Sequence, residues 1–81
     1  MNTVFTIEPG VEVLVFRTNI RFKKDLRQVS AALDNTPGIR RWNVDREDTD
    51  KVLRIESTRL QPADIIQLIT AAGFHCEELP E

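Results

Sequence analysis

The feature that most limits the fold of this chain is the order in which strand-like and helix-like apolar patterns follow one another. Residues 11–17 form a short run rich in β-branched and aromatic side chains, which predicts a strand. An apolar stripe with spacings of four, three and four comes next, and it predicts a helix for which Asn19 offers an N-cap oxygen. The stripe consists of Phe22, Leu26, Val29 and Leu33.

The second half of the chain again contains a strand and a helix, and it adds two strands. Residues 39–45 alternate between apolar and polar side chains and predict a half-buried strand, which a polar turn separates from a third strand at residues 51–56. A second helix is expected to begin at Pro62, which suits the first helical position, and to end at Gly73. Residues 74–79 predict a last short strand.

The element order β-α-β-β-α-β predicts an α+β fold, a ferredoxin-like sandwich with two helices on one face of a four-stranded antiparallel sheet. Right-handed crossovers then place the turn after the first strand, the hairpin at residues 46–50 and the turn at residues 73–74 at the same end. We assign residues 11–81 to this domain. Residues 1–10 form either a lead-in or an extra edge strand, which could pair within the chain or with a second copy.

Composition excludes several classes of protein. The 81 residues suit one domain, and a net charge of −2 argues against a dedicated nucleic-acid binder. No apolar run approaches about 18 residues, so we expect no membrane span. Cys76 is the only cysteine, which rules out an internal disulfide and fits a reducing cytoplasm. No serine, cysteine or histidine set has the arrangement of an activated nucleophile, so we do not expect an enzyme.

A set of residues spread between Val11 and Leu79 follows the pattern of a known family. They are Val29, Leu33, Pro37-Gly38-Ile39, Trp42, Val44-Asp45 and Ala72-Gly73-Phe74. In this order and at nearly these spacings, the chain resembles the heavy-metal-associated (HMA) domain of copper chaperones. The resemblance implies the ferredoxin-like fold, and the family's own activity is heavy-metal binding and transport.

The segment that would hold the metal departs from that family. Counted back from Val29, the family's methionine and its two cysteines fall on Ile20, Phe22 and Asp25. Soft thiolates hold Cu(I), and the segment IRFKKD contains no soft donor atom. We therefore expect no metal or other cofactor at this place. We expect Phe22 to fill the space with hydrocarbon and to pack against Phe74, which occupies the family's aromatic position.

Two side chains keep a metal hypothesis open. His75 and Cys76 are expected near this segment, and Asp25 could join one of them. Adjacent strand residues point to opposite faces, and a structural zinc site has about four ligands. The simpler interpretation makes Cys76 a small buried hydrophobe and His75 a surface residue. The alternative is a transition-metal site that uses Cys76, His75 or Asp25, within one chain or across a dimer interface.

Basic residues surround the start of the first predicted helix: Arg17, Arg21, Lys23, Lys24 and Arg27. Because helix N-termini attract anions, this group could dock an acidic partner or a small phosphate, or it could balance the acidic hairpin at residues 46–50. Three functions follow: a non-catalytic module that contacts a protein partner or a second copy, a heavy-metal carrier with a non-standard site, and an anion sensor. The first is favoured because the scaffold is kept while the metal loop is replaced.

Overall fold

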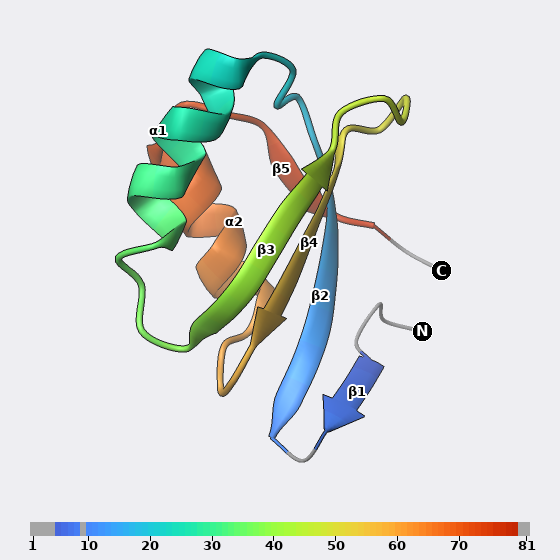
Figure 1. Ribbon diagram of the computed structural model, residues 1–81, viewed down its shortest axis with the longest axis vertical. Helices are drawn as coiled ribbons and strands as arrows, with labels where there is room; N and C mark the ends of the chain where they lie inside the picture. Colours follow the sequence, from blue (N-terminus) through green and yellow to red (C-terminus); the bar gives the residue numbers. More distant parts are fainter. Residues whose placement is uncertain (1–4, 9, 80–81) are drawn as a thin grey trace.

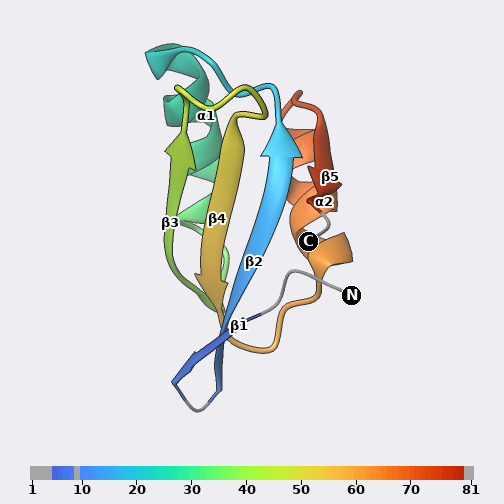
Figure 2. The same cartoon turned by 90° about the vertical axis from the view of Figure 1, so that its right-hand side faces the viewer.

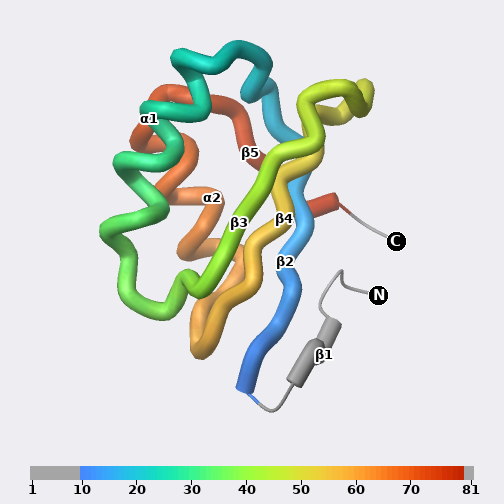
Figure 3. The backbone as a smooth tube through the Cα atoms, viewed as in Figure 1, coloured from blue at the N-terminus to red at the C-terminus, as the bar shows by residue number. Residues whose placement is uncertain are grey.

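The computed structural model of the protein describes residues 5–8 and 10–79, with side chains described from Gly10 onward. Its helices and strands follow one another in the predicted order (Figures 1 and 3), with one further strand at the start (Figure 1). The elements are β1 (Phe5–Glu8), β2 (Val11–Thr18), α1 (Lys23–Leu33), β3 (Ile39–Asp45), β4 (Val52–Ser57), α2 (Pro62–Ala71) and β5 (Cys76–Glu78).

The strands form one antiparallel sheet in which β2 and β4 are central. β3 pairs with β4 on one side, and β1 and β5 share the other edge of β2. β1 pairs along the first residues of β2, up to Val13, while β5 pairs with its last residues, from Phe16 onward. Both helices lie on one face of the sheet (Figures 1 and 2). The predicted ferredoxin-like α+β sandwich is therefore confirmed.

The strand β1 lies in the segment before Val11, for which the sequence left two alternatives. Phe5–Glu8 forms an edge strand that pairs antiparallel with β2 of the same chain, so a lead-in does not describe these residues. The register shifts between Thr6 and Glu8, an irregularity of the β-bulge type. Residues 1–4 and 9 of this segment lie outside the described residues.

The core lies between the inner face of the sheet and the two helices. Alternate residues of β2 and β4 point into it, so that Leu14 faces Ile55 and Phe16 faces Leu53 across the strand pair. The apolar stripes of the helices close the core on the other side. The buried cluster consists of Leu14, Phe16, Ile20, Val29, Leu33, Leu53, Ile55, Ile65, Ile69 and Cys76.

The start of α1 differs from the prediction. The helix begins at Lys23, so the predicted N-cap at Asn19 is wrong, and Phe22 is the N-cap residue. A phenylalanine side chain has no acceptor atom, so only the reverse half of a capping box forms, in which the carboxylate of Asp25 accepts the N–H of Phe22 at 3.0 Å. Asn19 has another role: its Oδ1 accepts the N–H of His75 at 2.8 Å and so ties the end of β2 to the segment before β5.

Candidate functional site

Three segments gather at one end of the molecule, which we call the loop end: residues 19–22, residues 46–51 and residues 72–75 (Figure 1). The last residue of β2 joins the first two of these segments, because the N–H of Thr18 donates to the carbonyl oxygen of Asp50 at 3.0 Å. The bond between Asn19 and His75 joins the first to the third. The prediction that these turns share one end is therefore confirmed.

The side chain of Thr18 ties the loop end together from the inside. Its hydroxyl donates to the carbonyl of Lys51 at 2.6 Å and accepts the N–H of Ile20 at 3.2 Å. Thr18 is only 6% exposed, so water competes little for these two bonds. Sequence reasoning missed this residue, although its position two residues after Phe16 places it on the same inward face of the strand.

Residues 20–25 stand where the HMA pattern has its metal loop, and the first and last of them are buried. Ile20 is part of the core, and Asp25 is 8% exposed. The Oδ2 atom of Asp25 accepts the N–H groups of Arg21 at 3.1 Å and Phe22 at 3.0 Å. The bond from Phe22 is the main cause that lowers the pKa of Asp25, and it outweighs the opposing effect of desolvation. Asp25 therefore fixes the backbone of this loop.

Phe22 points out of the molecule, so the prediction that it fills the metal-loop position is wrong. It is 59% exposed, and it is the one large apolar side chain so exposed among residues 10–79. Ile20 already occupies the core beside the loop, and the extended backbone of the N-cap turns Phe22 away from the helical stripe. Phe74 packs against the core and is half-buried. The Nζ atom of Lys24 lies 5.7 Å from the centroid of the Phe22 ring.

Cys76 and His75 lie in different environments, as the alternation along a strand predicts. Cys76 is 7% exposed in the core, and burial, with the charge of Glu77, raises the pKa of its thiol to about 12. The side chain of His75 is exposed, and its Nε2 lies 3.6 Å from Oε2 of Glu77. Within the described part of the chain, no three histidine, cysteine, aspartate or glutamate side chains gather as a metal site requires.

The basic residues at the loop end divide into two groups. Arg17 lies between two acids, with its Nε 3.2 Å from Oδ1 of Asp50 and its Nη1 3.0 Å from Oε1 of Glu77. Arg17 therefore balances the acidic hairpin within the molecule. The other four predicted cations are exposed, and none lies within 4.0 Å of a carboxylate of residues 10–79: Arg21, Lys23, Lys24 and Arg27.

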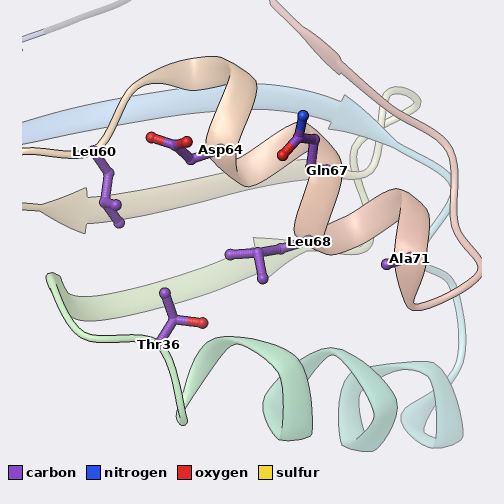
Figure 4. Close-up of a pocket in the computed structure, with 6 residues that line it drawn as sticks. All are labelled: Thr36, Leu60, Asp64, Gln67, Leu68 and Ala71. Carbon is purple, nitrogen blue, oxygen red and sulfur yellow. The ribbon is translucent and has the colours of Figure 1, made fainter.

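Two hollows open on the helical side of the molecule. A pocket of about 350 Å³ follows α2 on the side that faces α1 (Figure 4). It is lined by Thr36, Leu60, Asp64, Gln67, Leu68 and Ala71, and none of these is a predicted site residue. A second hollow of about 550 Å³ lies between α1 and the edge strand β3. It is lined by Leu26, Arg27, Ser30, Ala31 and Trp42, of which Arg27 is one of the predicted cations. We call this second hollow the edge groove.

No protein-family model matches the sequence, and no similar curated protein is found. Solved structures do share its fold. The copper binding domain of a P-type ATPase superposes with a TM-score of 0.73 at 22% identity, over 85% of this chain and 95% of that domain. The apo HMA domain of the copper chaperone for superoxide dismutase gives 0.73 at 16% identity, over 85% and 67%. The N-terminal domain of PacS from Synechocystis PCC6803 gives 0.69 at 16% identity, over 83% and 96%.

These likenesses establish a shared fold. The chain has an HMA-like, ferredoxin-like fold, as the resemblance implied. None of the described helices combines the length and the apolar character that a crossing of a bilayer requires.

Proposed function

We propose that the chain is a non-catalytic protein-binding module on a metallochaperone-like scaffold, and that its partner docks on the loop end. The exposed ring of Phe22 is the observation that carries the proposal. N-cap positions favour serine, threonine, asparagine or aspartate, so a phenylalanine there gives up both a cap and its own burial. A residue that violates a local sequence preference, as Phe22 does at the N-cap, is typical of functional sites. A protruding aromatic side chain also suits the energetic anchor of an interface.

The charges around Phe22 indicate what the partner carries. Lys23, Lys24 and Arg27 follow it on α1 and favour an acidic surface opposite them. The exposed acids Glu47 and Asp48 lie at the same end, on the hairpin between β3 and β4. A uniformly anionic membrane would be attracted by the first group and repelled by the second. A protein surface with both signs can match both groups, and this fixes its orientation.

The proposal treats the metal-loop position as one that no longer holds Cu(I). Residues 20–25 supply no thiolate, and the one thiol nearby, that of Cys76, is buried and protonated. A metal would have to displace that proton and reach into the core. The buried, protonated thiol also fits a reducing cytoplasm. The competing function is heavy-metal binding through Cys76, His75 or Asp25, in one chain or across a dimer.

A metal titration decides between these two functions. Cu(I) and Zn²⁺ are added under reducing conditions in the presence of a chromophoric chelator, with the wild-type chain and with Cys76→Ala. We expect the chelator to keep the metal equally well with both proteins. Sub-micromolar binding that Cys76→Ala abolishes would establish the competing function.

The docking surface is tested on a partner isolated with the immobilised chain and then purified. We expect Phe22→Ala to weaken its binding by at least about tenfold. The double change Lys23→Glu with Lys24→Glu should weaken it too, and more strongly at low salt. The matched control is Arg59→Asp in the loop between β4 and α2, where aspartate tolerates the φ of 63°. Equal affinities for Phe22→Ala and this control would rule out the loop end as the docking surface.

A further inference from the structure

The outer edge of β3 is an unused pairing surface. β3 is the last strand of the sheet on its side, and no described strand lies beyond it (Figure 2). Its register with β4 shifts between Ile39 and Arg41, which interrupts the edge at its start. From Arg41 to Asp45 the strand is regular. In this stretch alternate residues direct their N–H and C=O groups away from β4, and these groups are available to another strand.

We infer that a second copy of this chain pairs with β3, edge to edge and antiparallel, about a two-fold axis at Asn43. The sequence Arg-Trp-Asn-Val-Asp over residues 41–45 is complementary to itself when reversed. Arg41 then lies opposite Asp45 of the second copy, and the same pair forms again on the other side of the axis. Both side chains point to the face of the sheet that the helices leave open, and both are exposed in the single chain. Asn43 meets its own copy on the axis.

The other face of the same strand is complementary in shape. Trp42 and Val44 point towards the helices, where both are half-buried. The edge groove lies beside Trp42, between α1 and β3. In the antiparallel pairing, Val44 of the second copy lies opposite Trp42 and enters this groove. The indole Nε1 already donates to Oδ1 of Asp34 at 2.9 Å. The polar atom of the ring therefore has its hydrogen bond, and the rest of the ring offers an apolar surface to Val44.

Charge decides between this register and the alternatives. A parallel pairing would set Arg41 against Arg41 and Asp45 against Asp45, and like charges directly opposite are destabilising. A slip by one residue would set the helices of the second copy on the opposite face of the sheet and would take its Val44 away from the edge groove. Charged edges usually keep sheets apart, but here the two signs coincide only in the antiparallel arrangement. A contact of five residues a side is small, so the dimer is weak and exchanges rapidly. The contact lies outside residues 19–22, 46–51 and 72–75, and Arg27, which lines the edge groove, is the one residue that it shares with the surface of the proposed function.

The test is sedimentation velocity at protein concentrations up to about 1 mM, where a weak dimer is populated. We expect Arg41→Asp and Asp45→Arg each to weaken dimerisation by at least about tenfold, because each removes two ion pairs and creates like-charge contacts. An equimolar mixture of these two variants restores opposite charges on both sides of the axis and should associate as a heterodimer. Arg54→Asp on β4 makes the same charge change on the same face, one strand inside the edge, and should leave association unchanged.

Two further readouts locate the contact. The emission of Trp42, the only tryptophan, should shift to the blue as concentration rises, because Val44 of the second copy covers its ring. Hydrogen exchange should slow at the free-edge amides of residues 41–45. A chain that stays monomeric at every concentration would overturn the inference. So would variants whose mixture fails to associate, or a dimer in which exchange at β3 is unchanged.

Discussion

Asp25 and Phe22 are joined by a hydrogen bond of 3.0 Å from the N–H of Phe22 to the carboxylate of Asp25. The carboxylate accepts the N–H of the N-cap residue, which is the half of a capping box that needs no acceptor in the N-cap side chain. It also fixes the backbone from which the aromatic ring protrudes. The hydrogen bond between these two residues therefore stabilises the loop itself.

Replacing Asp25 should therefore affect both stability and docking. Asp25→Ala leaves the N–H groups of Arg21 and Phe22 without their acceptor, and we expect the Tm to fall by about 4–8 °C, the usual effect of a lost helix cap. Asp25→Asn keeps one acceptor oxygen and should lose less. Thermal unfolding followed by circular dichroism measures both.

The matched control for this variant is Asp64→Ala, since Asp64 accepts the N–H of Gln61 at 2.8 Å at the start of α2. It should cost similar stability and leave partner binding intact, whereas Asp25→Ala should weaken binding as well. Equal binding by the two variants would mean that the loop does not need Asp25 to present Phe22.

Trp42 should report on the protonation of Asp34. The carboxylate of Asp34 accepts the hydroxyl of Ser30 and the indole N–H of Trp42, and these two bonds, that of Ser30 first, lower its pKa. A lowered pKa means that the stabilisation is present above the ordinary aspartate value and is lost as the pH falls through the folded-state pKa. We therefore expect the Trp42 emission to change only below about pH 4.

Fluorescence titration of Asp34→Asn checks this assignment, because the variant cannot ionise and its Trp42 emission should stay constant over the same range. Asp48→Asn in the hairpin is the control and should titrate like the wild type. Circular dichroism at each pH separates a local change from acid unfolding. A transition in Asp34→Asn identical to that of the wild type would assign the signal to another group.

Cys76 should be unreactive while the chain is folded. Burial raises the pKa of the thiol from 9.0 to about 12, so at pH 8 the thiolate fraction is about a thousandfold lower than in the unfolded chain. Reaction with a disulfide reagent should therefore be slow and should accelerate in urea. The same shift predicts that stability falls as the pH rises from about 9 towards 12, because only the unfolded state loses its proton there. Cys76→Ala should remove that part of the alkaline loss, and a native thiol as reactive as the unfolded one would contradict the burial.

Two buried hydroxyls should respond in opposite ways to removal. Thr18→Val leaves the N–H of Ile20 and the carbonyl of Lys51 without partners, and we expect a loss of about 1–3 kcal/mol in the free energy of unfolding. The hydroxyl of Ser57 is buried and has no hydrogen-bond partner within the described residues. Ser57→Ala should therefore leave stability unchanged or raise it by up to about 1 kcal/mol. Urea unfolding measures both, and a similar loss in the two variants would indicate a hidden partner for Ser57.

The architecture could be predicted because it depends on periodicities that the sequence displays directly. The run of β-branched and aromatic residues in β2, the alternation in β3 and the stripes on α1 and α2 fix the element order, and handed crossovers then fix which turns meet. Phe22 shows where this reasoning stops. It has the right spacing for the helical stripe but lies one residue before the helix begins, where the backbone is extended. Periodicity could not reveal that Ile20 would take the core position.

The remaining errors concern contacts between distant residues. Asn19 has the composition of an N-cap, yet its side chain accepts the N–H of His75, 56 residues further along the chain. The charge pattern of residues 41–45 is visible in the sequence. Pairing with a second copy could be inferred from it only after the structure placed β3 at the edge of the sheet. Local patterns therefore predict elements, whereas the partner of a side chain depends on the assembled fold.

The bonds that Thr18 makes have a thermodynamic consequence for any molecule that docks at the loop end. Because its hydroxyl joins Ile20 to Lys51, the segment that presents Phe22 is already ordered before an encounter. Complex formation then sacrifices little conformational entropy in this loop, and each contact made by the ring contributes to affinity in full. Changes at Phe22 should accordingly appear in the lifetime of a complex rather than in the rate at which it forms.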